Sequence, residues 1–139
     1  MPLIHAPRGL PGAGKTTLAK RIAAATAAVH VELDVIKLAV WPDVPRMYDP
    51  YSGPGLAVQQ AFEAEVLTHL TAGHNVVLDR TNLNEEGLRR IQRLVPGVRI
   101  VIHDLRDTPL DDCLARDAAR PPHSQVGADG IRALHHRWL

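Results

Sequence analysis

The apolar positions of this chain alternate between two spacings along its length. Short runs of β-branched and aliphatic residues are typical of buried strands, and apolar residues that recur every three or four positions are typical of helices packed on one face. The short runs predict strands at residues 3–6, 29–33, 75–79 and 98–104. The helical spacing predicts helices over residues 35–41, 83–95, 109–120 and 128–139, with two more that are defined by their apolar stripes.

The first of these two helices follows the first strand and begins at Thr16. Its predicted buried face consists of Leu18, Ile22, Ala25 and Val29. The second lies near the middle of the chain and is closed by Gly73, a residue type that commonly follows a helix. Its predicted buried face consists of Val58, Phe62, Val66 and Leu70. Both stripes predict helices that pack against a sheet.

Prolines mark several predicted boundaries. We expect Pro7 to end the first strand, because proline removes a hydrogen-bond donor from the ladder. Residues 42–55 show no periodicity and predict an irregular segment. Thr108 is the predicted N-cap of the helix over 109–120, with Pro109 at its first position, and Pro121-Pro122 breaks that helix.

Alternating strands and helices predict an α/β fold with a parallel sheet covered by helices on both faces. The chain of 139 residues, 45% of them hydrophobic, is long enough for one domain with a single core. We therefore expect one domain over residues 1–139, with about four parallel strands and no fifth strand. In such sheets the functional site lies at the carboxyl ends of the strands.

Charge and composition narrow the class of protein further. The 16 basic and 15 acidic residues nearly balance, so the chain lacks the strong positive charge of a tight nucleic-acid binder. Cys113 is the single cysteine, which excludes an internal disulfide, and we expect it in the core. The histidines are scattered and predict no metal site. With no signal sequence and no long apolar run, we expect a cytoplasmic protein with no membrane partner.

The most informative segment is Gly-Leu-Pro-Gly-Ala-Gly-Lys-Thr at residues 9–16, which matches the phosphate-binding loop pattern G-x-x-x-x-G-K-[ST]. Backbone N–H groups of this loop surround a phosphate, Lys15 adds positive charge, and the Thr16 hydroxyl is a ligand for Mg²⁺. A strand precedes the loop and a helix follows it, as the motif requires. The predicted nucleotide-binding residues are Gly9, Gly12, Ala13, Gly14, Lys15, Thr16 and Thr17.

Two carboxylates lie at the ends of predicted strands. Asp79 directly follows Val76-Val77-Leu78, where a phosphate-loop protein holds the carboxylate that orients Mg²⁺. The alternative is an aspartate that caps the next helix. Asp34 follows the second strand, three residues before Lys37. This pair could accept the proton of an acceptor hydroxyl and hold a neighbouring anion, or it could be an N-cap beside a solvated lysine.

Arg116 and Arg120 are four residues apart and share one face of the predicted helix, just before the proline break. Arginines on a mobile segment can close over a triphosphate and stabilise the charge of a transferring phosphoryl group. We therefore expect a helical lid over residues of about 106–125. The alternative is a surface pair that is neutralised by Asp112 and Asp117.

These segments resemble the phosphate-loop polynucleotide kinases and the polynucleotide-kinase-like ATP-binding proteins. Four blocks carry the resemblance: Arg-Gly-Leu-Pro-Gly-Ala-Gly-Lys-Thr-Thr-Leu-Ala-Lys at 8–20, Leu-Asp-Val-Ile-Lys at 33–37, Val-Val-Leu-Asp-Arg-Thr-Asn-Leu-Asn at 76–84, and Cys-Leu-Ala-Arg-Asp-Ala-Ala-Arg at 113–120. The third block is the most discriminating, because related kinases share the phosphate loop without this phrase.

The resemblance implies an ATP- and Mg²⁺-dependent kinase that phosphorylates a 5′-hydroxyl of RNA or DNA. It implies that Asp34 is the general base and that Arg116 and Arg120 belong to a lid over ATP. Together with Lys15, these are the predicted catalytic residues, and the predicted metal ligands are Thr16 and Asp79. The predicted acceptor-binding residues are Lys37, Arg80, Thr81 and Asn82.

Two alternatives remain at this point. Phosphate-loop kinases of small hydroxylated molecules share the outline of the first 40 residues, and Lys37 stands where the polynucleotide kinases usually have an arginine. The other alternative is a catalytically weak protein that binds a nucleotide without transferring phosphate.

Three aromatic residues lie in or next to the irregular segment: Trp41, Tyr48 and Tyr51. They could stack on a nucleic-acid base or fill a loop. The sequence does not indicate an oligomeric state.

Overall fold

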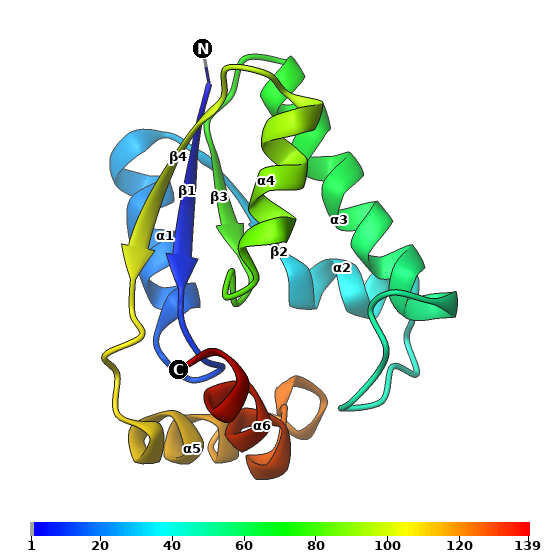
Figure 1. Ribbon diagram of the computed structural model, residues 1–139, viewed down its shortest axis with the longest axis vertical. Coiled ribbons are helices and arrows are strands. Elements are labelled where there is room, and N and C mark those ends of the chain that lie inside the picture. The colour runs from blue at the N-terminus through cyan, green and yellow to red at the C-terminus, as the bar shows by residue number, and fades with distance from the viewer. Residues whose placement is uncertain (1) are drawn as a thin grey trace.

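A computed structural model describes residues 2–139 and shows strands and helices in alternation (Figure 1). The strands are β1 (Leu3–Arg8), β2 (Val29–Glu32), β3 (Val76–Asp79) and β4 (Arg99–Asp104). The helices are α1 (Lys15–Thr26), α2 (Leu33–Val40), α3 (Gly53–Thr71), α4 (Glu85–Leu94), α5 (Leu110–Ala118) and α6 (Ala128–Trp138), with a short 3₁₀ helix, η1 (Pro122–Ser124), between the last two. This is the predicted α/β fold.

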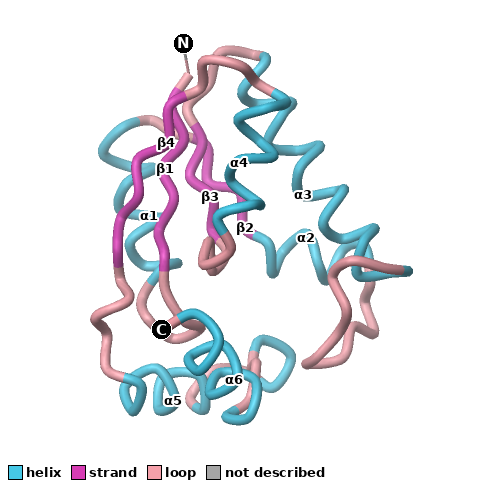
Figure 2. Tube along the Cα trace, viewed as in Figure 1, coloured by secondary structure: helices cyan, strands magenta, loops and turns pink. Residues whose placement is uncertain are grey.

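The four strands form one parallel sheet in the order β2-β3-β1-β4. β1 is central, with Ile4 opposite Val76 of β3 and Ile100 of β4. At the carboxyl ends of β2 and β3, Glu32 lies opposite Asp79. Because all strands run in the same direction, their carboxyl ends share one edge, where the loops that follow β1 and β3 lie and where β2 runs directly into α2 (Figure 2).

Helices cover both faces of the sheet, as the alternation predicts. The larger core lies between the sheet and α2, α3 and α4, and it is centred on Phe62 and Val66 of α3, with Ile91 of α4. Ala19 and Ile22 of α1 pack against the other face. α5 and α6 stand apart from both faces, beyond the carboxyl ends of β1 and β4 (Figure 1), where Cys113 and Ile131 form a third cluster with Leu10.

The helix stripes are confirmed in α3 and only in part in α1. All of the predicted residues of α3 are buried: Val58, Phe62, Val66 and Leu70. In α1 the buried residues are Lys15, Ala19 and Ile22, whereas Ala25 is exposed and Val29 already belongs to β2. Ile22 is buried and Leu18 packs against the same cluster, so the prediction was wrong for Ala25 and Val29 alone. The small alanines of α1 fit either a buried or an exposed position, so periodicity alone does not fix its buried face.

Several predicted boundaries need correction. α3 begins at Gly53, inside the segment predicted to be irregular. β2 ends at Glu32, so Asp34 lies in the first turn of α2. Thr108 does not cap α5: Pro109 holds the N-cap position, and the Thr108 hydroxyl donates to the carbonyl of Ala13 at 3.4 Å. The helix ends at Ala118, which places Arg120 in the turn that follows.

Pro7 lies inside β1 and does not end it. The strand continues to Arg8, and Pro7 is opposite His103 of β4. The carbonyl of Pro7 accepts the Asn82 side-chain amide at 2.6 Å on the β3 side, where the β1–β3 ladder has already ended. The missing N–H faces this same side, because the N–H and carbonyl of one strand residue face the same neighbour. Proline is therefore tolerated here without the loss of a ladder hydrogen bond.

Of the helices in residues 2–139, none combines the length and the apolar character needed to cross a membrane.

Candidate functional site

The phosphate loop joins β1 to α1 at the carboxyl edge of the sheet. Gly12 and Gly14 have φ angles of 85° and 99°, a left-handed conformation that glycine adopts without strain. The N–H of Ala13 donates to the carbonyl of Leu10 at 3.0 Å, so this amide, unlike the expectation, is used within the loop. The N–H of Gly9 donates to Thr81 at 3.1 Å, which ties the loop to the segment after β3.

Lys15 is buried at the centre of this loop. Its side chain is folded back, and Nζ donates to the carbonyl of Leu10 at 2.7 Å. Burial lowers the pKa of Lys15 to about 8, and the charge of Asp79 opposes this shift in part. An anionic ligand should stabilise the buried ammonium strongly, because the ligand compensates a positive charge that the protein has removed from water.

Thr16 and Asp79 meet across α1 and β3. The Thr16 hydroxyl donates to Oδ2 of Asp79 at 2.9 Å, and His30 Nε2 lies 2.8 Å from the same oxygen. Asp79 is 6% exposed. Its alternative role as a helix cap is excluded, since Asn84 caps α4 by accepting from the N–H of Glu86 at 3.0 Å. The structure therefore brings the two predicted metal ligands together.

Asp34 and Lys37 form an ion pair of 3.1 Å in the first turns of α2. The side chain of Asp34 is 48% exposed, whereas that of Lys37 is 16% exposed, so the lysine is not the solvated residue of the capping alternative. The N-cap position belongs to Glu32, and its side chain makes no capping bond. Asp34 directly follows the end of β2 at the carboxyl edge of the sheet, where the phosphate loop follows β1.

Helix α5, which belongs to the predicted lid, packs directly on the phosphate loop. A Cβ at position 12 would overlap the backbone carbonyl of Cys113, so only glycine fits there. Arg116 Nη1 donates to the carbonyl of Gly12 at 3.3 Å and does not pair with Asp112. Cys113 is fully buried, as predicted, and burial raises its pKa. The predicted lid is thus in contact with the loop.

Burial is the main cause of the lowered pKa of Lys15, and the positive charge of Arg120 adds to it. Nη1 of Arg120 is 3.9 Å from Asp117, a long ion pair. Asp117 is 2% exposed, and its carboxylate accepts the N–H groups of Val126 and Gly127, each at 2.9 Å. Asp117 therefore fixes the turn between α5 and α6 and is not chiefly the partner of the arginines.

The segment Arg80-Thr81-Asn82 connects β3 to α4 and is used mainly within the protein. Asn82 has a φ of 52°, is 3% exposed, and its side-chain amide lies within hydrogen-bond distance of the Pro7, Leu78 and Arg80 carbonyls. The guanidinium of Arg80 lies 4.9 Å from the Phe62 ring centroid, and Nε donates to Asn82 Oδ1 at 3.1 Å. These contacts position the ends of β1 and β3.

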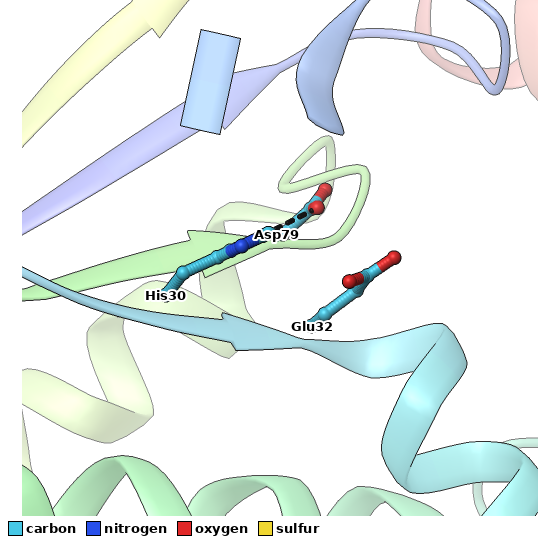
Figure 3. Close-up of side chains that lie close together, drawn as sticks. All are labelled: His30, Glu32 and Asp79. Atoms are coloured by element: carbon cyan, nitrogen blue, oxygen red, sulfur yellow. Dashed lines mark hydrogen bonds and ion pairs between the residues drawn. The ribbon is translucent and has the colours of Figure 1, made fainter. Parts of the chain in front are cut away.

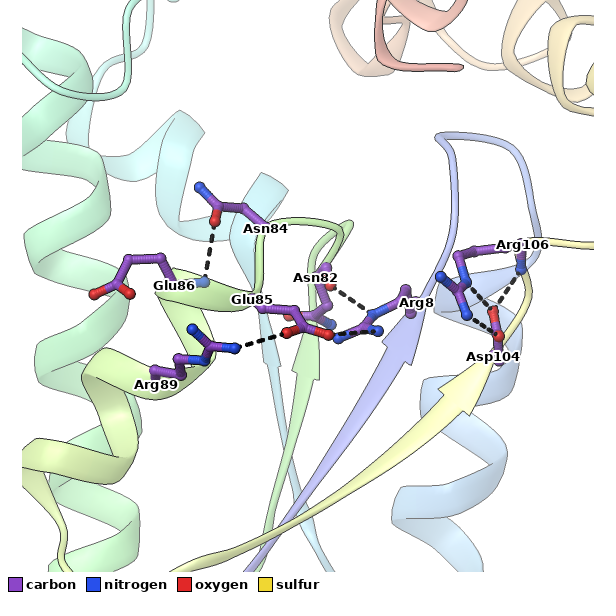
Figure 4. A network of polar contacts seen from close by, with 8 residues as sticks. All are labelled: Arg8, Asn82, Asn84, Glu85, Glu86, Arg89, Asp104 and Arg106. Atoms are coloured by element: carbon purple, nitrogen blue, oxygen red, sulfur yellow. Dashed lines mark hydrogen bonds and ion pairs between the residues drawn. The ribbon is translucent and has the colours of Figure 1, made fainter. Parts of the chain in front are cut away.

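Arg8 extends this polar network to α4, and a separate pair of Asp104 and Arg106 lies at the end of β4 (Figure 4). Nε of Arg8 donates to the carbonyl of Asn82 at 2.9 Å, and Nη1 lies 3.6 Å from Glu85 of α4, which also contacts Arg89. At the end of β4, side-chain and backbone hydrogen bonds from Arg106 lower the pKa of Asp104 to about 2. These contacts order the segments that follow β1, β3 and β4.

A cavity of about 350 Å³ opens beside the phosphate loop. It lies between α1, the segment after β4 and α5, with Leu18 and Leu105 as apolar residues and Arg21 and Arg116 as basic ones. Gly14 and Thr17 connect it to the loop. The cavity is on the β4 side of β1, whereas Asp34 and Lys37 follow β2, at the opposite edge of the sheet.

Sequence reasoning missed His30 and Glu32. Both lie on β2, two residues apart and so on one face, and Glu32 is opposite Asp79. Burial first and the charge of Asp79 second raise the pKa of Glu32. The pattern His-x-Glu at the end of a strand beside the strand of Asp79 would have identified the pair, had the strand order been known. Arg21 was also missed, because one basic residue on a helix carries no distinguishing pattern.

Proton uptake on nucleotide binding is an expected property of this site. The pKa of Lys15 is about 8, so at about pH 8.5 much of the free protein holds a neutral amine. An anionic phosphate favours the ammonium, so binding should take up about half a proton or more at this pH, and ATP affinity should fall as the pH rises further. Calorimetry with ATP in two buffers of different ionisation enthalpy measures the uptake. Equal uptake at about pH 7 and pH 9 would contradict the role of Lys15.

Residues 4–139 match the protein family described as the AAA domain. No curated protein matches the chain. Among solved structures it is similar to a chain of the Pnkp1/Rnl/Hen1 complex, with 22% identity and a TM-score of 0.68, over 87% of this chain and 40% of that one. It is also similar to a chain of the Pnkp1/Rnl/Hen1 RNA repair complex, with 20% identity and a TM-score of 0.68, over 99% of this chain and 46% of that one. A third similar structure is that of a sugar kinase from Janibacter sp. HTCC2649, with 17% identity and a TM-score of 0.66, over 100% of this chain and 78% of that one.

At these identities the structural similarities establish the fold, which is that of the phosphate-loop kinases. The chain spans less than half the length of the chains from the two Pnkp1/Rnl/Hen1 complexes. The family match covers nearly all of the present chain, and the expected resemblance is confirmed. This chain belongs to the AAA domain family and has the fold of the phosphate-loop kinases.

Proposed function

We propose that this chain is an ATP- and Mg²⁺-dependent kinase that phosphorylates the 5′-hydroxyl of RNA or DNA. One observation carries the proposal: the half-exposed carboxylate of Asp34, paired with Lys37, lies at the same edge of the sheet as a phosphate loop that Arg116 already contacts. A phosphate site with an accessible carboxylate as general base is the arrangement that phosphoryl transfer to a hydroxyl requires. This chemistry depends mainly on positioning and on charge stabilisation.

The loop and the cavity beside it fit a nucleoside triphosphate. Backbone N–H groups and Lys15 bind the phosphates, and the cavity with Leu18, Leu105 and Arg21 accepts the nucleoside. The Thr16 hydroxyl and the Asp79 carboxylate converge at 2.9 Å and are oxygen groups, the ligand type that Mg²⁺ prefers. Bound Mg²⁺ supplies neutralisation of the phosphate charge.

Asp34 is proposed to accept the proton of the acceptor hydroxyl. Its side chain is half-exposed and lies outside the Thr16–Asp79–His30 cluster, and it follows β2, across β1 and β3 from the cavity. A nucleoside on the β4 side and a hydroxyl on the β2 side would approach the phosphate loop from opposite directions. This is the arrangement for an in-line displacement.

Arg116 and Arg120 are proposed to stabilise the transferring phosphoryl group. Arg116 is at the loop already, and the positive charge of Arg120 adds to the lowering of the Lys15 pKa. A further contact joins the lid to the acceptor side: Arg46 Nη2 donates to Gln125 Oε1 at 3.0 Å. The irregular segment before α3 and the lid therefore close the site together.

Three features support a nucleic-acid acceptor. The Asp79–Asn84 phrase resembles that of polynucleotide kinases, and the chain is similar in fold to proteins of an RNA repair complex. Tyr51 is 69% exposed, and its hydroxyl is 3.3 Å from the amide of Asn84, so its ring is available for stacking on a base. Trp41 and Tyr48 instead pack edge-to-face on each other.

A kinase of a small hydroxylated molecule is the second candidate. The similarity to a sugar kinase, which extends over 78% of that protein, and the near balance of charges favour it. The two candidates share the nucleotide site and the base, and they differ in the acceptor. A protein that binds ATP without phosphoryl transfer would share the nucleotide site alone, and it would form no ADP in response to any acceptor.

An acceptor screen distinguishes these functions. The purified chain is incubated with γ-labelled ATP and Mg²⁺ at low salt, with RNA and DNA oligonucleotides that end in a 5′-hydroxyl or a 5′-phosphate, and with gluconate, sugars and other small hydroxylated compounds. We expect label in 5′-hydroxyl strands and none in the matched 5′-phosphate strands. Label in a small compound alone would overturn the nucleic-acid acceptor and establish the second candidate.

Lys37 is expected to bind a phosphate of the acceptor. Lys37→Ala should raise the acceptor KM several-fold and leave ATP affinity unchanged, whereas Lys37→Arg should keep or raise activity, because arginine binds phosphate with two donors. For Lys37→Ala the slope of log KM against log salt should also fall by about 0.7, the contribution of one phosphate contact on a single strand. Lys20→Ala, on the exposed face of α1, is the matched control. An unchanged KM and salt slope would remove Lys37 from the acceptor site.

A further inference from the structure

His30, Glu32 and Asp79 form a cluster of potential metal ligands at the end of β2 and β3 (Figure 3). His30 and Glu32 are on one face of β2, and Glu32 is opposite Asp79 in the ladder. Figure 3 shows all three side chains on the same side of the two strands, with the imidazole directed at the Asp79 carboxylate. The cluster is built on regular sheet, so its members are held by the backbone.

We propose that His30, Glu32 and Asp79 bind a divalent transition-metal ion, for which Mn²⁺ is the test ion, and that they do so without a nucleotide. The site shares Asp79 with the proposed Mg²⁺ site but differs from it in ligands. Metal binding by the free chain does not rest on phosphoryl transfer or on the identity of the acceptor, so it can be tested separately from the proposed function.

The spacing of the ligand atoms supports this site. One ligand atom from each residue lies within 4.8 Å of the other two, and His30 Nε2 is 2.8 Å from Asp79 Oδ2. Ligands at about 2.1 Å from an ion are about 3 Å apart when they subtend a right angle and about 4.2 Å apart when they face each other. The imidazole and the carboxylate already have the spacing of neighbouring ligands, and the Glu32 carboxylate would move toward them by rotation of its side chain.

The charge of the cluster also favours a cation. Glu32 and Asp79 are two carboxylates side by side, and Glu32 forms no hydrogen bond or ion pair among residues 2–139. His30 contacts Asp79 alone of the two. A divalent ion would join the three groups and compensate both negative charges in a region that is only partly exposed.

The imidazole sets the selectivity of the site. Mg²⁺ prefers oxygen ligands and retains several waters, whereas nitrogen ligands favour Mn²⁺, Co²⁺ and Zn²⁺. A site with one histidine and two carboxylates should therefore bind Mn²⁺ more tightly than Mg²⁺. The Thr16 hydroxyl donates to the same Oδ2 of Asp79 that lies beside His30 Nε2, so a bound ion would replace these two hydrogen bonds, and the Glu32 carboxylate provides a further oxygen.

The test is a titration of the full chain with Mn²⁺ and no nucleotide, in which electron paramagnetic resonance measures the free ion and ¹⁴N modulation of the spin echo reports a nitrogen ligand. We expect one Mn²⁺ per chain, displaced by Mg²⁺ only at about tenfold or greater excess. His30→Gln should remove the ¹⁴N signal and weaken Mn²⁺ binding by about tenfold or more. His74→Gln, at an exposed histidine, is the matched control and should retain both.

Glu32→Gln keeps the shape of the side chain and is the second variant. It should weaken Mn²⁺ binding but keep the ¹⁴N signal at saturating metal. No Mn²⁺ binding by the unaltered chain, or an unchanged affinity and ¹⁴N signal in His30→Gln, would overturn the proposal. Either result would leave the kinase proposal standing, because ATP binding and acceptor labelling in Mg²⁺ are measured independently.

Discussion

Lys15→Met is expected to abolish phosphoryl transfer, with a fall of at least about 10²-fold in kcat/KM and a clear loss of ATP affinity. The substitution removes the one buried ammonium of the phosphate loop and retains an apolar stem of similar length. Because the pKa of Lys15 is lowered by burial, its charge destabilises the free fold below about pH 8. The variant should therefore be folded, with a melting temperature equal to or above that of the parent at neutral pH.

Lys20→Met is the control for this experiment, since Lys20 is exposed on the same helix. It should change neither ATP binding nor transfer. Calorimetry with ATP and Mg²⁺, thermal unfolding and the labelling assay together separate loss of binding from loss of structure. A folded Lys15→Met variant that binds ATP as the parent does and transfers phosphate normally would refute the assignment of the loop.

Asp34→Asn is expected to lower kcat by about 10²-fold or more, with little change in the Kd for ATP. The amide keeps the shape of the carboxylate but cannot accept the proton of the acceptor hydroxyl. Asp34 is in the first turn of α2, where loss of a negative charge costs up to about 1 kcal/mol of stability. Single-turnover labelling with saturating acceptor measures the chemical step directly.

Asp43→Asn removes an exposed carboxylate from the segment that follows α2 and serves as the control. It should leave kcat unchanged. If Asp34→Asn lost activity only in proportion to a loss of folded protein, as judged by thermal unfolding, then Asp34 would be a helix-stabilising residue. A general base elsewhere at the carboxyl edge of the sheet would then be required.

The sheet and the phosphate loop could be predicted because their signals are local. Four apolar runs give the four strands within a few residues, and the glycine spacing at residues 9–16 fixes the loop. The buried face of α3 was predictable because large apolar residues recur at every turn. The face of α1 was not, because several alanines fit either a buried or an exposed position.

The chemistry was predictable where a residue follows a strand in sequence, and less so where it depends on strand order. Asp79 and Asp34 were identified by their positions after strands, and both lie at the expected edge. His30 and Glu32 were missed, since their meeting with Asp79 depends on β2 pairing with β3, which no local pattern specifies.

Asn82 shows a different kind of limit. A polar residue after a strand suggests ligand binding, and here it was assigned to the acceptor site. In the structure its side-chain amide is engaged with the carbonyls of β1 and β3, and its left-handed φ is one that asparagine tolerates better than most residues. The residue type therefore reflects the backbone that it supports, and sequence alone does not separate this use from contact with a substrate.

The contact between Arg116 and the Gly12 carbonyl has a consequence for the energetics of recognition in the proposed kinase. A lid arginine that waited in solvent would lose conformational entropy when it met the triphosphate, and that loss would weaken binding. Here the guanidinium is preorganised at the loop. When the nucleotide binds, the hydrogen bond from Arg116 to a neutral carbonyl is replaced by one to an anionic phosphate oxygen. Most of the ordering of this side chain has then taken place during folding.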